Sequence, residues 1–130
     1  MNMKKTIVPK QFSHYYNDWH FAPAVEVDKF VFFSGVTGTR PDRSISSDPE
    51  TQFRDAFETV LLYLAEAGLS FNDVVDMTTY HVGLRKHLEI FKKVKDEFVK
   101  EPYPTWTAIG VAELITKAAL VEIRVVACRS

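Results

Sequence analysis

The last apolar stretch of the sequence, residues 120–128, constrains the fold more than any other segment. Its residues fall into two alternating sets, Val121, Ile123, Val125 and Ala127 in one, and Leu120, Glu122, Arg124, Val126 and Cys128 in the other. A β-strand points alternate residues to opposite faces of a sheet, and here both faces carry apolar side chains. Two helices can cover only one face of a small sheet, so the other face needs a partner. We expect that partner to be a second copy of the chain.

The remaining apolar patterns predict an α+β domain. Segments rich in aromatic and β-branched residues predict four more strands, at residues 21–27, 29–34, 74–82 and 106–111. Apolar residues at 3.6-residue spacing predict two helices. The first begins after an N-cap at Ser47 and ends near Gly68, and the second carries apolar residues from Leu84 to Phe98 with its lysines in solvent. No repeat or linker interrupts the pattern, so we expect residues 1–130 to form a single domain.

Composition excludes several classes of protein. Sixteen Lys and Arg residues against seventeen Asp and Glu residues give a net charge of −1, so no positive field recruits a phosphate backbone and we expect no nucleic-acid partner. The first six residues lack the apolar core of a signal peptide, and no apolar run is long enough to span a bilayer. A single cysteine, Cys128, allows no internal disulfide. We therefore expect a cytoplasmic protein that has no membrane partner.

Neither a metal nor a cofactor is expected. The histidines at positions 14, 20, 81 and 87 fit no metal-ligand spacing. The stretch from Ser34 to Gly38 contains two glycines, but it precedes a loop rather than a helix and lacks the Lys-Ser/Thr ending of a phosphate-binding loop. We interpret it as a turn.

Four residues carry alternative interpretations. Glu122 and Arg124 share one face of the last strand among apolar neighbours. They form either a structural ion pair or, in the case of Arg124, an anchor for a ligand carboxylate. His81 is either an interior histidine or a catalytic base, and Trp106 is a core residue, an interface anchor or a platform for a ligand.

Several short motifs, taken together with the order of the predicted elements, resemble the Rid family. The motifs are Phe33-Ser34-Gly35, Ala67-Gly68-Leu69, Pro104 and Val121-Glu122-Ile123, and the resemblance covers residues 21–128. This family is also known as the YjgF group and carries the labels translation inhibitor and L-PSP endoribonuclease. The residues at 79–81 and 102–111 are most similar to its YjgH-type branch.

The resemblance implies a fold like that of bacterial chorismate mutase, with a mixed sheet, two helices packed on one face, and a homotrimer around a central barrel. It also implies three ligand clefts between subunits, which would supply the missing cover for the sheet. The best-known members are enamine/imine deaminases that hydrolyse intermediates such as 2-aminoacrylate. They use an Arg to bind the substrate carboxylate and a Glu to position water.

This sequence departs from the deaminase pattern at each of those positions. Trp106 stands where the Arg is expected, Arg124 where the Glu is expected, and Phe21 where an aromatic hydroxyl is expected. We therefore expect little or no ordinary 2-aminoacrylate deaminase activity. A gained guanidinium at Arg124 leaves the cleft able to bind an anion, with Trp106 on a neighbouring wall. The residues expected to line it are Phe21, Ser34, Gly35, Trp106, Thr107, Ala108 and Arg124, and the candidates for a replacement base are His81 and Glu113.

Three functions remain open at this point. The first is an intersubunit site, enzymatic or sensory, for a small carboxylated or carbonyl metabolite. The second is an RNA-cleaving or translation-inhibiting protein, for which Lys92, Lys93, Lys95 and Lys100 form a local basic patch. The third is a trimeric scaffold without chemistry.

Overall fold

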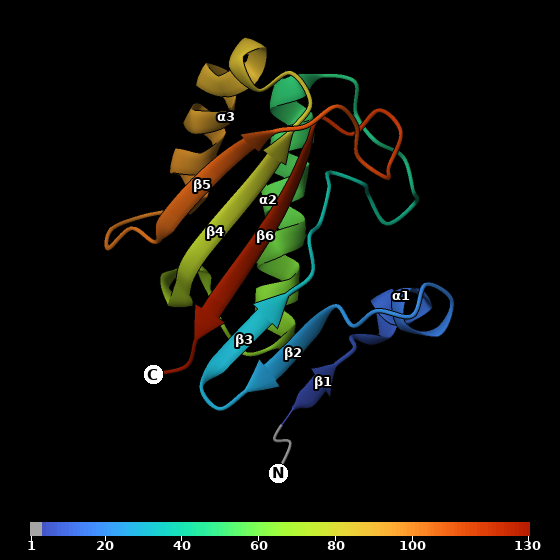
Figure 1. Cartoon of the computed structure of the whole chain (residues 1–130), viewed down its shortest axis with the longest axis vertical. Coiled ribbons are helices and arrows are strands. Elements are labelled where there is room, and N and C mark those ends of the chain that lie inside the picture. Colours follow the sequence, from blue (N-terminus) through green and yellow to red (C-terminus); the bar gives the residue numbers. More distant parts are fainter. Residues whose placement is uncertain (1–3) are drawn as a thin grey trace.

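The computed structural model describes residues 4–130 as a mixed six-stranded sheet with helices packed against it (Figure 1). The strands are β1 (Lys5–Ile7), β2 (Ala24–Val27), β3 (Phe30–Phe33), β4 (Val74–His81), β5 (Thr105–Gly110) and β6 (Val121–Cys128). The α-helices are α1 (Ser13–Asn17), α2 (Pro49–Glu66) and α3 (Leu84–Phe98). The spatial order of the strands is β1-β2-β3-β6-β4-β5, and only β4 and β5 run parallel. The predicted α+β class is confirmed.

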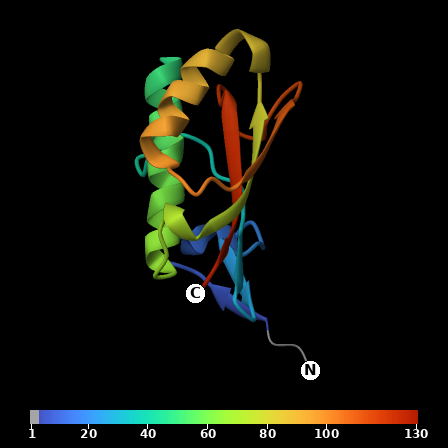
Figure 2. The same ribbon diagram turned by 90° about the vertical axis from the view of Figure 1, so that its left-hand side faces the viewer.

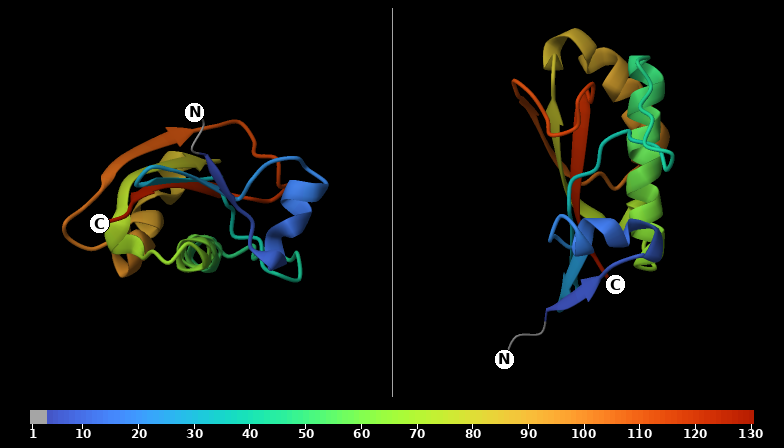
Figure 3. Two further views of the ribbon diagram at one scale, coloured as in Figure 1. Left: turned by 90° about the horizontal axis from the view of Figure 1, so that it is seen from below. Right: turned by 90° about the vertical axis from the view of Figure 1, so that its right-hand side faces the viewer.

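Helices α2 and α3 cover the same face of the sheet (Figure 2), as the sequence predicts. In Figure 1 these two helices lie behind the sheet, and the opposite face, which we call the helix-free face, is turned toward the viewer. Figure 3 shows the sheet curving around α2, with the short helix α1 beside the β1 and β2 end. No helix among residues 4–130 is long and apolar enough to cross a membrane.

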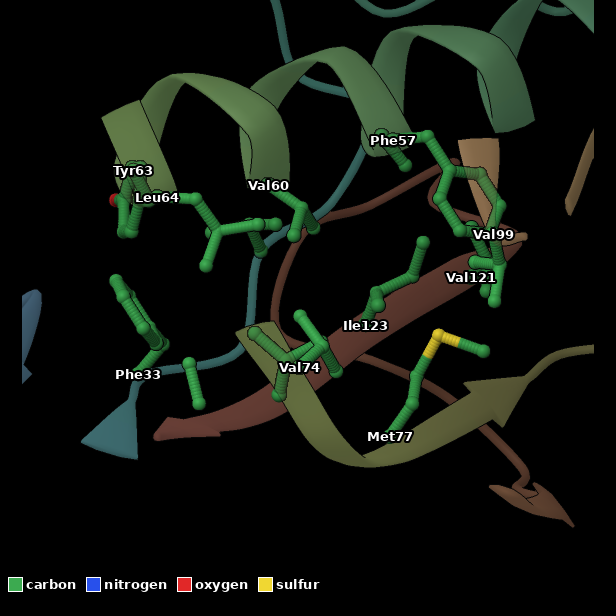
Figure 4. Close-up of a cluster of buried hydrophobic side chains, with 14 of the residues drawn as sticks. Phe33, Phe57, Val60, Tyr63, Leu64, Val74, Met77, Val99, Val121 and Ile123 are labelled. Atoms are coloured by element: carbon green, nitrogen blue, oxygen red, sulfur yellow. The ribbon is translucent and has the colours of Figure 1, made fainter. Parts of the chain in front are cut away.

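The core lies between the two long helices, α2 and α3, and the sheet, and Figure 4 shows part of it. Residues Val121, Ile123, Val125 and Ala127 of β6 are buried there, and the intervening residues of β6 point to the helix-free face. Phe57 and Leu64 of α2 are fully buried against this surface. The alternation predicted for the last strand is therefore confirmed, and the helices of this chain cover only one of its faces.

The beginning of α2 corrects one sequence-based expectation. Asp48, not Ser47, is the N-cap residue, and its carboxylate accepts hydrogen bonds from the backbone N–H of Thr51 at 3.0 Å and from the Thr51 hydroxyl at 2.7 Å. Pro49 then occupies the first helical turn, where its missing N–H costs nothing. At the other end Gly68 adopts φ of 75°, as expected for a glycine that follows a helix in the left-handed conformation.

Two further expectations need correction. Residues 4–130 form three α-helices rather than two, because residues 13–17 make the short α1, and they form a sixth strand, β1, at the sheet edge. Lys95 of α3 does not face solvent as its neighbours Lys92 and Lys93 do. Its side chain is only 14% exposed and lies over the ring of Trp106.

Candidate functional site

The register of the central strands divides the expected site residues between the two faces of the sheet. Trp106 is paired with Met77, whose side chain is buried beneath the helices. Thr78, the next residue of β4, is paired with both Thr107 and Arg124, and it points the other way. Within one chain Trp106 and Arg124 therefore lie on opposite faces of the sheet, and the expectation that they form neighbouring walls of one cleft does not hold there.

The helix-side group is a short hydrogen-bonded chain under α3. The indole N–H of Trp106 donates to Thr79 Oγ1 at 2.9 Å, and Thr79 Oγ1 lies 2.7 Å from His81 Nε2. A hydroxyl group carries one donor hydrogen and two acceptor lone pairs, so Thr79 can accept from the indole and hydrogen-bond with His81 Nε2 at the same time. Ala108, paired with Thr79 across the sheet, shares this face.

His81 is an interior residue in this structure. It is 1% exposed, and the ring of Phe91 meets it edge-on with centroids 4.6 Å apart. Burial lowers the pKa of His81 to about 4 because the charged ring would lose its hydration. A histidine held neutral beneath a helix has no access to water from the helix-free face.

Trp106 is packed as a core residue. Its ring lies 6.1 Å from that of Phe91 and 4.8 Å beneath the ammonium of Lys95. The cation over the ring and the indole hydrogen bond together fix the side chain against α3. Of the three interpretations of Trp106, packing in the core describes it within a single subunit.

The helix-free group contains the other expected residues. Ser34 follows β3, and its hydroxyl donates to the carbonyl of Ala22 at 2.7 Å, which joins the segment after β3 to the segment before β2. Gly35 lies directly against the carboxyl group of Glu122. Phe21, 36% exposed, precedes Ala22 in this same segment.

Arg124 occupies the exposed side of β6, next to Thr78 and two residues beyond Glu122. Within residues 4–130 it makes no ion pair, so the structure holds no Glu122–Arg124 salt bridge. Glu122 is half-buried, and loss of hydration raises the pKa of its carboxyl group. Glu122 and Arg124 are thus two separate ionisable groups on the same face of the sheet.

A shallow hollow extends the helix-free group toward the edge of the sheet. Its volume is about 440 Å³, and it is lined by Lys4, Thr6, Tyr16, His20, Phe21, Ala22 and Val25. The aromatic rings of Tyr16 and Phe21 line it together, so its chemistry suits a planar group. Among these residues only Phe21 was expected from the sequence to belong to a site.

Glu113 lies apart from both groups. It is exposed in the loop between β5 and β6 and lines a second hollow of about 550 Å³. That hollow contains none of the other expected site residues. Among residues 4–130 there is also no group of three His, Cys, Asp or Glu side chains placed to hold a metal ion.

Thr79 and Lys95 are partners of the expected site residues that were not predicted from the sequence. Thr79 stands two residues before His81, and strand alternation could have placed the two on one face. The contact between Lys95 and Trp106 could not be predicted from the sequence, because it depends on how α3 packs against β5.

Comparisons of the sequence and of the structure with known proteins point to the same family. The family model described as endoribonuclease L-PSP matches residues 15–129. The RutC family protein YjgH of Escherichia coli is 36% identical over 100 residues, covering 76% of each chain. A solved structure of a YjgH protein covers 98% of both chains with 31% identity and a TM-score of 0.87. A structure of E. coli TdcF with bound serine covers 85% of this chain and 88% of its own, with 31% identity and a TM-score of 0.72.

Proposed function

Because the chain belongs to the endoribonuclease L-PSP (YjgF) family, we propose that it binds a small carboxylated or carbonyl metabolite on the helix-free face of its sheet. The observation that carries this proposal is the guanidinium of Arg124, which is exposed and free of any ion pair within residues 4–130. A guanidinium binds a carboxylate through two parallel hydrogen bonds. Arg124 is therefore the anchor of the proposed site.

The surroundings of Arg124 support a site for a small ligand. Ser34, Gly35 and Glu122 lie on the same face, and Thr107 adjoins Arg124 through their shared partner Thr78. The TdcF structure with bound serine belongs to a protein 31% identical to this one, and serine is a small molecule with a carboxylate. Both points favour a metabolite over a macromolecule.

A second copy of the chain completes the proposed site. Trp106 and Ala108 lie on the helix side of β5, an edge strand, so they can approach a ligand at Arg124 only from a neighbouring subunit. The neighbouring subunit would be another member of the homotrimer that the family resemblance implies. The cleft is then formed between subunits, with Arg124 from one and the edge of β5 from the other.

Ordinary 2-aminoacrylate deaminase activity is expected to be absent or very weak. Trp106 offers no charge where the deaminase pattern has an Arg, and its only polar group is already bonded to Thr79. Arg124 is a cation where the pattern has a water-positioning Glu. The relevant assay is protection of a pyridoxal-phosphate enzyme from damage by 2-aminoacrylate. Protection equal to that by an ordinary deaminase of the family would contradict this part of the proposal.

The binding test compares wild type with Arg124→Met, using pyruvate as the probe and calorimetry or ligand-observed NMR as the measurement. Loss of a charged hydrogen bond costs about 1.5 to 3 kcal/mol, or about ten- to a hundredfold in affinity. Arg85→Met is the matched control, because Arg85 is an exposed residue of α3. Equal pyruvate affinity in all three proteins would overturn the proposal.

The RNA-cleaving alternative receives less support from the lysines of α3. Lys92 and Lys93 contact Glu89 and Glu50 at 3.4 Å, and Lys95 lies over Trp106. These contacts reduce the free positive charge that a phosphate backbone requires. RNA binding that weakens steeply with added salt would favour the alternative.

A further inference from the structure

The ammonium group of Lys95 is largely buried, and the protein offers it no good hydrogen-bond acceptor. Its side chain is 14% exposed, and its Nζ lies 4.8 Å from the centroid of the Trp106 ring and 3.9 Å from Asp96 Oδ1. An ammonium has three N–H donors. The face of an aromatic ring attracts its charge but accepts no ordinary hydrogen bond, and 3.9 Å is too long for one.

The neighbouring lysines differ from Lys95 in this respect. The ammonium groups of Lys92, Lys93 and Lys100 each donate a hydrogen bond to a protein oxygen, and all three residues are exposed. Lys95 is the least exposed of the four, and within residues 4–130 it donates no hydrogen bond. A buried charge without hydrogen-bond partners is unfavourable, so an anion placed next to Lys95 would be stabilised.

Lys95 lies at the edge of the sheet that a neighbouring subunit would approach. Helix α3 packs against β5, the last strand at that edge (Figure 1), and Trp106 belongs to β5. The Lys95 ammonium therefore lies over a residue that the proposed function places in the intersubunit cleft. Arg124 of the same chain is on the opposite face of the sheet. Each proposed cleft then combines Arg124 of one subunit with Lys95 of the next.

We infer that Lys95 binds a second acidic group of the ligand, so that the proposed cleft selects dicarboxylates over monocarboxylates. This inference rests on the proposed function, in which Arg124 takes the first carboxylate. The second carboxylate accepts the hydrogen bonds that the Lys95 ammonium lacks, and it meets a charge that the Trp106 ring already holds in place. A monocarboxylate bound at Arg124 leaves the ammonium without such a partner.

Asp96 does not take the place of this second carboxylate. It directly follows Lys95 in α3, and consecutive residues of a helix do not face each other. Its side chain is 75% exposed and stays 3.9 Å from the ammonium, and an exposed ion pair of this kind is weak. Asp96 therefore competes slightly with an incoming carboxylate without satisfying Lys95.

The test compares 2-oxoglutarate with 2-oxopentanoate, two keto acids of equal chain length that differ in a terminal carboxylate, by calorimetry on the full-length chain. In wild type we expect 2-oxoglutarate to bind about tenfold more tightly or better. Lys95→Met should remove this preference and change 2-oxopentanoate affinity by less than about twofold. Lys92→Met is the matched control, because it removes the same charge from an exposed position of α3, and it should keep the preference.

Asp96→Asn provides a second, independent variant that leaves Lys95 in place. Removing the competing carboxylate should raise 2-oxoglutarate affinity about two- to threefold and leave 2-oxopentanoate affinity unchanged. Because Asp96 is exposed, this variant should fold and assemble as wild type does. It decides the question if circular dichroism or sedimentation shows that Lys95→Met is misfolded or misassembled.

The outcomes separate this inference from the proposed function. Equal affinities for the two keto acids in wild type, or a preference that survives in a folded Lys95→Met, overturn the role of Lys95 and leave Arg124 as the anchor. A 2-oxoglutarate affinity that does not rise in Asp96→Asn also counts against Lys95 alone. Unchanged binding of both ligands in Arg124→Met overturns the anchor itself, and with it the proposed function.

Discussion

At the scale of one residue, the burial of His81 makes the free energy of unfolding depend on pH. Its pKa is about 4 in the folded protein, below the 6.5 of an ordinary histidine, because the buried ring is held neutral beside Thr79 and Phe91. The folded state therefore binds fewer protons than the unfolded state between these two values. The contribution of His81 to stability is complete above pH 6.5 and is lost as pH falls toward 4. We expect it to lower the free energy of unfolding by about 3 kcal/mol over that range.

The measurement is urea unfolding at several pH values for wild type and His81→Gln. The variant should be less stable than wild type at pH 7.5, and the difference should shrink by pH 4.5, because glutamine does not titrate. His20→Gln is the control, since His20 is exposed. A stability difference between wild type and His81→Gln that stays constant with pH would contradict the burial argument.

At the scale of one element, the N-terminus of α2 offers a direct test of capping. Asp48→Ala removes the acceptor for the Thr51 N–H and hydroxyl, and such losses at an N-cap cost about 1 kcal/mol. Ser47→Ala, one residue earlier, should have almost no effect, because the described contacts of α2 give Ser47 no capping role. Thermal unfolding of the two variants at one pH measures the difference. A larger loss in Ser47→Ala would restore the sequence-based assignment.

The elements also show what a single sequence can and cannot predict. Helices α2 and α3 and the alternation in β6 followed from periodicity, because each is long enough to repeat its pattern. The three-residue β1 and five-residue α1 are too short to carry such a signal. The faces of Trp106 and Arg124 depend on the register between β4, β5 and β6, which alternation within each strand does not determine. That is why the sequence could nominate candidate residues on β5 and β6 but could not predict their division between two faces.

At the scale of the whole molecule, the helix-free face is notable because large apolar side chains are exposed on it. Phe30 and Phe32 of β3 are 46% and 40% exposed there, and Ile109 of β5 is 39% exposed. Apolar side chains gathered on an uncovered sheet face favour association. Leu62 of α2 is similarly exposed, at 44%, but it lies on the side of that helix that faces away from the sheet.

We expect the chain to sediment at about three times its mass of 14.9 kDa, because the threefold packing implied by the family would cover the helix-free face. Phe32→Glu should shift the protein to a monomer, since a charge on that face would have to be buried on assembly. The same variant should stay folded by circular dichroism, because the side chain is already 40% exposed in a single subunit. Leu62→Glu places the same charge on α2 and should leave the trimer intact. A wild-type protein that sediments as a monomer at micromolar concentration would contradict the threefold assembly and the intersubunit cleft that depends on it.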